Sequence, residues 1–155
     1  MVKSFYRIVP LILGLLLAQG CSDDGSPEDR IRRLIDSAVQ AAEDRNLDGL
    51  SDFMHPDFID QQGNNRQQLA RLLRAYFFRH KKIHLFTRID SIEMLSANHA
   101  SVSLHVAMAG TVIPDVNALS SLSASIYRFE LQLIKQDDWL LRHASWEPAN
   151  IRAFD

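Results

Sequence analysis

The hydrophobic period of this sequence changes once, near residue 80. Before that point apolar residues recur every three or four positions, which is the spacing of one helix face. After it, apolar and polar residues alternate, as in strands with one buried face. Helices followed by strands indicate an α+β fold rather than an alternating α/β fold. Because twisted sheets curl, we expect three N-terminal helices packed on a curled, mainly antiparallel sheet, giving a cone-shaped domain with an interior.

Three helices are predicted in the first half of the chain. The first covers residues 27–45, the second covers residues 47–54, and the third runs from 66 to about 79. Pro56 breaks the helical pattern of the second, and a short extended piece begins at Phe58. The apolar stripes of the two long helices are Ile31, Leu34, Ile35, Ala38, Val39 and Ala42 in the first, and Leu69, Leu72, Leu73, Tyr76 and Phe77 in the third.

Four strands are predicted in the second half. Apolar and polar residues alternate over residues 83–89, 102–108, 127–133 and 139–146. The connection formed by residues 110–123 is long, and it contains five large apolar residues. We therefore expect this connection to pack against another part of the domain.

The first 20 residues are typical of a signal peptide. Lys3 and Arg7 precede an apolar run over residues 8–18, which is short for a membrane span, and Cys21 follows directly. This order resembles a bacterial lipoprotein signal, in which the Cys is lipidated and becomes the new N-terminus. The predicted organisation is therefore a signal peptide at 1–20, a lipidated Cys and tether at 21–26, and a folded domain at 27–150.

The lipoprotein signal also predicts a location. A lipidated Cys21 would anchor the chain to a membrane in the bacterial cell envelope, facing the periplasm. Ser22, rather than Asp, follows the Cys, which in enteric-type lipoproteins resembles the pattern sorted to the outer membrane. Cys21 is the only Cys in the chain, so no internal disulfide can form.

Composition and motifs exclude several classes of protein. Without its leader the chain carries 15 basic and 19 acidic residues, a net charge of −4, which argues against a nucleic-acid-binding role. The sequence contains no phosphate-binding loop, dinucleotide fingerprint or nucleophile elbow. We predict no cofactor.

Three stretches resemble one superfamily. They are Glu-Asp-Arg-Asn-Leu-Asp-Gly-Leu at 43–50, Phe-Ile-Asp-Gln-Gln-Gly at 58–63 and Ala-Ser-Trp-Glu-Pro at 144–148. With the element order, they resemble the nuclear transport factor 2-like superfamily over residues 29–148. The resemblance implies a cystatin-like roll. It says little about chemistry, because the same scaffold carries ketosteroid isomerases, polyketide cyclases, scytalone dehydratases and many uncharacterised bacterial proteins.

The resemblance makes Asp60 the candidate catalytic residue. Counted back from Gly63, Asp60 occupies the position at which ketosteroid isomerases carry a general-base Asp, and an apolar cone would raise its pKa. Those isomerases also carry a Tyr oxyanion donor in the first helix, and the matching position here falls on or near Ala38. The alternative interpretation is that Asp60 accepts hydrogen bonds from the turn backbone at Gln62 or Gly63.

Aromatic and His side chains provide candidate pocket residues, although aromatic side chains are more often plain core and His side chains are more often hydrogen-bonded or solvated. The six His show no metal-binding pattern: His80 and His84 are four residues apart, but they straddle the change from helix to strand. We predict no metal site. The candidate pocket residues are Tyr76, Phe86, His105, Tyr127, His143 and Trp146.

The end of the third predicted helix raises a separate question. Tyr76, Phe77 and Phe78 are adjacent, and three adjacent side chains cannot all face one side of a helix. We expect Phe78 to meet another element or a partner. The basic residues 79–82 that follow are either a helix end or a contact for anionic lipid head groups.

These observations favour a non-catalytic binding or accessory module over an enzyme. Either the cone would hold a small apolar or amphipathic ligand, or the open sheet face would pair with a second copy of the chain, since sheet-face dimers are common among proteins that resemble this one. The first alternative is an isomerase, dehydratase or cyclase-like enzyme that uses Asp60 as general base. The second is a component that docks onto another envelope protein through an aromatic patch around Phe78.

Overall fold

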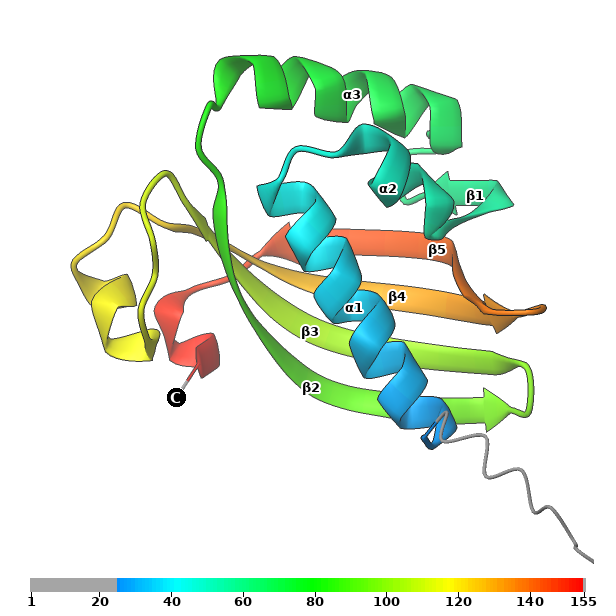
Figure 1. The fold of residues 1–155 in the computed structure, drawn as a ribbon. Coiled ribbons are helices and arrows are strands. Elements are labelled where there is room, and N and C mark those ends of the chain that lie inside the picture. Colours follow the sequence, from blue (N-terminus) through cyan, green and yellow to red (C-terminus); the bar gives the residue numbers. More distant parts are fainter. Residues whose placement is uncertain (1–24, 155) are drawn as a thin grey trace, which may run out of the picture.

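The computed structural model describes residues 25–154, which form three helices on one side of a curled five-stranded sheet (Figure 1). Two short 3₁₀-helices, η1 and η2, lie together at one end of the sheet (Figure 1). The fold is α+β, as predicted. In chain order the elements are α1 (Pro27–Glu43), α2 (Leu47–Asp52), β1 (Met54–Asp60), α3 (Arg66–Arg79), β2 (His84–Ser96), β3 (His99–Ala109), η1 (Val116–Ser120), β4 (Ser125–Lys135), β5 (Trp139–Pro148) and η2 (Ile151–Phe154).

Both long helices begin with a capping box. The Ser26 hydroxyl accepts a hydrogen bond from the Asp29 N–H at 3.1 Å, and the Asp29 carboxylate accepts one from the Ser26 N–H at 3.0 Å. Asn65 and Gln68 form the same pair of bonds at the start of α3, at 3.0 and 2.8 Å. The local sequence therefore fixes where each long helix starts.

The strands are ordered β1-β5-β4-β3-β2 across the sheet. β1 pairs with β5 in parallel, and all other neighbouring strands pair antiparallel, which confirms the prediction of a mainly antiparallel sheet. β1 is an edge strand. This position accommodates Pro56, because a residue without an N–H interrupts a central strand but not an edge.

α1 packs its apolar stripe on the concave face of the sheet. Ile31 and Ile35 belong to one buried cluster with Val102 and Leu104 of β3, and Ile31 and Val102 are fully buried. Val102 pairs with Leu131 of β4, so the two side chains face the same side of the sheet. The three helices therefore cover the face that carries the apolar half of each alternating strand (Figure 1).

α3 closes a second part of the same core. Leu73 of α3 packs on Phe58 of β1 and Ala144 of β5, both of which are buried. Leu131 and Leu141 border this cluster and the α1 cluster alike. The concave side therefore holds one continuous core.

The convex side is covered at one end by the chain itself. Ile113 and Leu119, from the connection at residues 110–123, pack with Phe154 of η2 against Ala107 of β3. The predicted packing of this connection is confirmed. The rest of the convex face does not contribute to this cluster.

Several boundaries differ from the predictions, most clearly those of β1 and β2. Met54 was expected at the end of the second helix, but it is the first residue of β1. β2 was expected to end at Ile89, but it extends to Ser96. The register shifts between Ile89 and Ser91, which leaves Asp90 without a partner on β3. This bulge reverses the alternation of apolar and polar residues, so a search for strict alternation loses the strand there.

The predicted signal peptide and Cys21 lie outside the described residues. Among the helices in residues 25–154, none is long and apolar enough to cross a membrane. All members of the three clusters lie between Ile31 and Phe154. Residues 25–154 thus contain a hydrophobic core, which is the basis for experiments on this part of the chain alone.

Candidate functional site

An apolar cavity of about 360 Å³ lies between the helices and the concave face of the sheet. Its walls come from all three helices and from β2, β3 and β4. The space exists partly because α1 presents two alanines to it, where larger side chains would fill the gap. Among the residues that line it are Ile35, Ala38, Ala42, Leu104, Met108 and Phe129.

Tyr76 is the only polar side chain among the fifteen residues that line the cavity. Its hydroxyl donates a hydrogen bond to the Sδ atom of Met108 at 2.8 Å, and its ring stacks on His80 with the centroids 4.2 Å apart. Burial, reinforced by the nearby Tyr127 hydroxyl, raises the pKa of Tyr76. Tyr76 therefore stays neutral near pH 7 and can donate a hydrogen bond into the cavity.

Asp60 lies at the end of β1, but it does not line this cavity. Its Oδ1 atom accepts hydrogen bonds from the Gln62 and Asn64 N–H groups, both at 2.8 Å, and its Oδ2 atom accepts one from the Asn64 side chain at 2.9 Å. Burial alone would raise the pKa of Asp60, but these three hydrogen bonds and the nearby His143 lower it below its usual value. The carboxylate is thus held ionised, and its oxygens are occupied by the turn.

The neighbouring Gln61 fastens the same turn to β5. Its side-chain amide donates to the Trp146 carbonyl at 2.9 Å, and its side-chain oxygen accepts from the Trp146 N–H at 3.1 Å. The Gln61 N–H also bonds to the Ala144 carbonyl. Gly63 completes the turn with a φ of 81°, a conformation that suits glycine. The 58–63 stretch therefore forms a bonded corner between β1 and β5.

Two of the other candidate pocket residues flank the cavity from the concave side. The rings of Tyr127 and Trp146 pack on Phe129, with centroid distances of 6.5 and 5.9 Å. Phe129 lines the cavity, whereas Tyr127 and Trp146 do not. They support the wall rather than form its surface.

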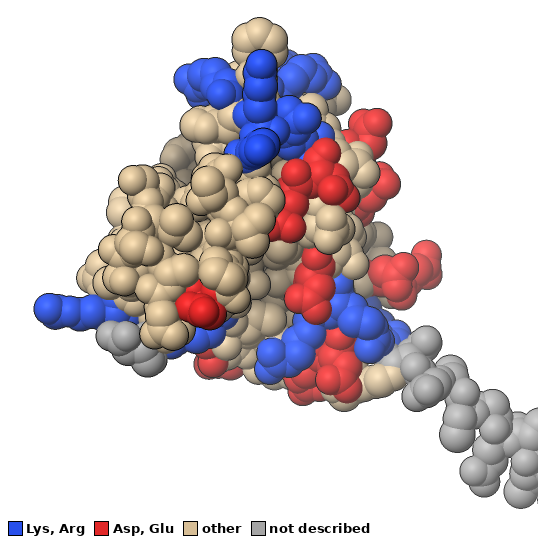
Figure 2. Space-filling view, turned by 60° about the vertical axis from the view of Figure 1, so that its left-hand side comes forward, with Lys and Arg blue, Asp and Glu red and all other residues tan. Residues whose placement is uncertain are grey.

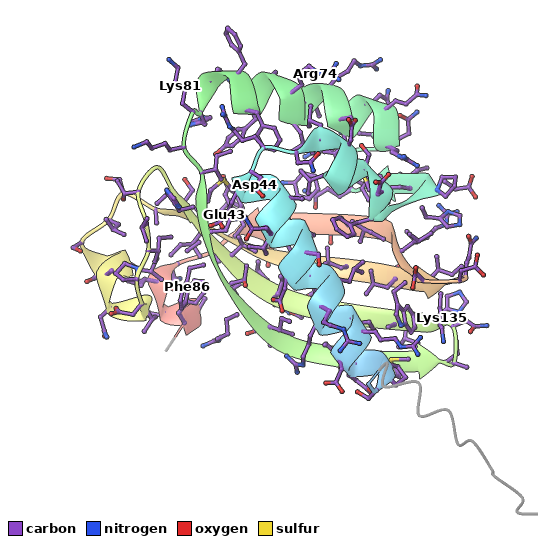
Figure 3. All side chains as sticks on the ribbon, in the orientation of Figure 1. Glu43, Asp44, Arg74, Lys81, Phe86 and Lys135 are labelled. Atoms are coloured by element: carbon purple, nitrogen blue, oxygen red, sulfur yellow. The ribbon has the colours of Figure 1, made fainter. Side chains whose placement is uncertain are left out.

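Two more candidates lie on the convex face. The rings of Phe86 and His105 contact Phe154, with centroid distances of 5.6 and 6.1 Å, and Figure 3 shows Phe86 beside the 3₁₀-helices, away from the three helices that cover the cavity. The Nδ1 atom of His105 lies 2.7 Å from the Asp90 carboxylate, but the two groups are not aligned for a hydrogen bond. Neither side chain reaches the cavity, because odd- and even-numbered strand positions point to opposite faces.

His143 also points away from the cavity. Its neighbour Ala144 faces the concave core, and successive residues of a strand alternate between faces. Of the six candidate pocket residues, the structure therefore brings only Tyr76 to the cavity surface. The aliphatic residues that line the cavity were visible in the sequence as helix and strand stripes, but nothing in the sequence separated them from ordinary core positions.

A second hollow, of about 400 Å³, has both charged and apolar residues in its lining and lies between α1, the end of α2 and the turn before β5. Arg30, Arg33, Asp52, Lys135 and Asp138 line it, and its charges are mixed (Lys135 is labelled in Figure 3). Within residues 25–154 no group of three or more His, Cys, Asp or Glu side chains is placed to hold a metal ion.

Comparisons with known proteins bear on the fold. No known protein-family profile matches the sequence, and no curated protein matches it. Solved structures do match the fold. One is a candidate scytalone dehydratase from Novosphingobium aromaticivorans, with a TM-score of 0.66 and 13% identity over 79% of this chain and 84% of the other.

Two further structures resemble this chain without an assigned activity. One is a domain with a cystatin-like fold from Nostoc punctiforme, with a TM-score of 0.60 and 16% identity over 80% of this chain and 78% of the other. The other is a protein like nuclear transport factor 2 from Shewanella oneidensis, with a TM-score of 0.56 and 20% identity over 78% of this chain and 98% of the other. The chain has the nuclear transport factor 2-like, or cystatin-like, fold that its sequence predicted.

Proposed function

We propose that this nuclear transport factor 2-like domain is a binding module that holds a small apolar molecule in the cavity beneath its helices. The observation that supports this most strongly is the cavity itself, which has fifteen lining residues and one polar side chain. Its volume of about 360 Å³ falls in the range of small-molecule sites, about 300–1,000 Å³. Burial of an apolar ligand there would supply most of the binding free energy.

The contacts of Asp60 support a binding role over the enzymatic alternative. A general base needs a free lone pair near the proton that it removes, and a pKa close to the working pH. Asp60 has its oxygens bonded to the turn, and its pKa is lowered rather than raised. The position matching the isomerase oxyanion donor, Ala38, carries a methyl group on the cavity wall. A candidate dehydratase shares the fold, but a shared fold does not carry a reaction with it.

The Tyr76 hydroxyl suggests the chemistry of the ligand. Its acceptor in this structure is the Met108 thioether, and sulfur is a weak acceptor. A ligand carbonyl or hydroxyl oxygen would be a stronger one. We therefore propose that the ligand is largely hydrocarbon and carries one oxygen that accepts from Tyr76.

An uncharged, environment-sensitive naphthalene dye tests whether the cavity binds apolar molecules. Residues 25–155 should bind the dye with an increase in fluorescence. Ala38→Leu should weaken binding about tenfold, because the added carbons occupy space worth about two methylene groups to a ligand. The same change should leave the melting temperature equal or higher, since it fills a cavity. Ala42→Leu, on the same wall, provides a second variant if Ala38→Leu does not fold.

Ala97→Leu is the matched control, because Ala97 is exposed in the turn between β2 and β3. It should bind the dye like the unmodified domain. Tyr76→Phe should weaken binding of a ketone-bearing dye more than binding of a hydrocarbon analogue. Dye binding that is equal in Ala38→Leu, Ala42→Leu and Ala97→Leu would contradict the proposal.

The cell-envelope location is also a proposal. The sequence before residue 25 supports attachment of the domain to a bacterial membrane through lipidated Cys21, facing the periplasm. Ser22 after the Cys supports transport to the outer membrane. Pairing of two copies through the rest of the convex face stays a prediction. In that area the Ser103 hydroxyl donates a hydrogen bond to the Glu130 carboxylate at 2.9 Å. Sedimentation of residues 25–155 would show one species of twice the domain mass if such pairing occurs.

A further inference from the structure

The outward side of α3 and the residues after it form a concentrated basic surface. From Arg66 to Lys82 the chain contains six Arg and Lys and no acidic residue, although the whole chain has a net charge of −2. Figure 2 shows these cations gathered at one end of the molecule. We call this the α3 basic surface and define it by Arg71, Arg74, Phe78, Arg79, Lys81 and Lys82.

The cations of this surface form no salt bridge within the described residues. No salt bridge joins Arg71, Arg74 or Arg79 to an acidic side chain of residues 25–154. A solvated helix face normally mixes acids and bases at positions three or four apart, which pair with one another. α3 lacks the acidic half of that pattern, so its positive potential extends into solvent.

Phe78 lies among the cations of this surface. Its side chain is 86% exposed, whereas the adjacent Phe77 is buried. Arg71, Arg74 and Arg79 border the same shallow hollow as Phe78. Phe78 does not pack in the core, and a polar residue would be more favourable at a solvated position. We therefore infer that Phe78 contacts something outside this chain.

We propose that the α3 basic surface binds the head-group region of a bilayer that contains anionic phospholipid. Arg and Lys would contact lipid phosphates, and Phe78 would insert its ring at the boundary with the acyl chains. Clusters of four to eight cations on a helix are typical of such binding, and this surface has five. A single aromatic ring that projects between cations suits a soft interface, whereas an acidic protein partner would have to supply a matching pocket for it.

This surface is separate from the predicted anchor and from the cavity. It lies at the end of the domain opposite the start of α1 (Figures 1 and 2). A lipid on Cys21 would be attached near the start of α1, so the two membrane contacts would lie at opposite ends of the domain. Membrane binding by the α3 basic surface can therefore be tested independently of ligand binding in the cavity.

Vesicle sedimentation with residues 25–155 tests the proposal without a lipid anchor. The domain should bind vesicles of equal parts phosphatidylglycerol and phosphatidylcholine, and it should bind phosphatidylcholine vesicles at least about 100-fold more weakly. Arg71→Gln with Arg74→Gln should weaken binding about 25-fold, about fivefold for each cation removed. Phe78→Ser should weaken it about tenfold. Added salt should weaken binding of the unmodified domain, because it screens the charges.

Matched controls remove the same side chains elsewhere. Arg32→Gln with Arg152→Gln removes two exposed cations from α1 and η2, and Leu95→Ser removes an exposed apolar side chain from β2. Both controls should bind anionic vesicles like the unmodified domain, and far-UV circular dichroism should show every variant folded.

Three results would overturn the proposal. The first is equal binding to anionic and neutral vesicles. The second is equal loss in the control and α3 variants, which would indicate non-specific attraction. The third is a concentration-dependent dimer that Phe78→Ser abolishes while vesicle binding persists, which would assign the surface to a second copy of the chain.

Discussion

Asp60 is hydrogen-bonded to the turn that follows β1, although its place in the sequence resembles that of the general base of ketosteroid isomerases. Its side chain is 2% exposed, and its oxygens accept three hydrogen bonds from Gln62 and Asn64. Charge-assisted bonds of this kind stabilise a tight turn strongly, because the donors would otherwise be left unpaired. We therefore assign Asp60 the role of holding the corner between β1 and β5.

Asp60→Asn should destabilise the domain by about 1–3 kcal/mol near pH 7, because the variant loses the charge and turns an NH₂ group toward the Asn64 amide. Because folding lowers the pKa of Asp60, its ionised carboxylate stabilises the fold. This stabilisation is fully present above the pKa that Asp60 has in the unfolded chain, and it is lost as the pH falls through the pKa of Asp60 in the folded protein. The stability difference between the two proteins should therefore shrink in acid. Urea unfolding at several pH values measures it.

Asp57→Asn is the control for this prediction. Asp57 is in the same strand, and its side chain is 73% exposed. Its replacement should change stability by less than about 0.5 kcal/mol at any pH. Equal effects of the two substitutions would remove the structural role that we assign to Asp60.

At the scale of elements, η2 packs on the convex side of the sheet and covers one end of it. Phe154 is 7% exposed and contacts Phe86 of β2, while the Arg88 guanidinium lies 5.9 Å from its ring centroid. Ile113 and Leu119 from the connection before β4 complete this cluster. The cluster is separated by the sheet from the core under the helices, so it can open without that core unfolding.

Phe154→Ala should destabilise the domain by up to about 3 kcal/mol, since removal of a buried Phe leaves a cavity, and the short η2 can shift to close part of it. Hydrogen exchange should quicken at the amides of Leu119 and its neighbours and stay slow at Val102 in β3. Phe78→Ala is the control and should change neither, because Phe78 is exposed. Faster exchange throughout β3 would show instead that η2 is part of the main cooperative unit.

At the scale of the whole molecule, three regions are proposed to act separately: an anchor at the start of the chain, a cavity beneath the helices and a basic surface on α3. The start of α1, which follows the predicted anchor in sequence, and α3 lie at opposite ends of the domain (Figure 1). A tether of residues 21–26 would hold the domain within about 20 Å of the anchoring membrane, because an extended chain spans at most about 3.5 Å per residue.

Cys21→Ser should abolish the anchor. In cells fed a radiolabelled fatty acid, the unmodified chain should carry label and sediment with membranes, because acyl chains on Cys21 insert into the bilayer. The variant should carry no label. Ser22→Ala is the control and should remain labelled. Label that persists in Cys21→Ser would contradict lipidation at this residue.

Much of the fold could be predicted from local order in the sequence. The change from a helical to an alternating period near residue 80 predicted the element order, and Ser26 and Asn65 mark the starts of the long helices. Such features depend on residues only a few positions apart, so they can be recognised without knowledge of the tertiary structure. Where local order was broken, at Asp90 in β2, the prediction of the strand boundary failed.

The site depended on the tertiary structure. A one-residue change of register sends a strand side chain to the other face, so the sequence could not decide that Met108 lines the cavity while His105 meets Phe154. Nor could it decide the state of Asp60, because a carboxylate is ionised or protonated according to the donors that the folded turn brings to it. The sequence by itself thus determined the elements and their order. Tertiary packing decided which side chains share the cavity, because shared space depends on contacts between residues distant in the chain.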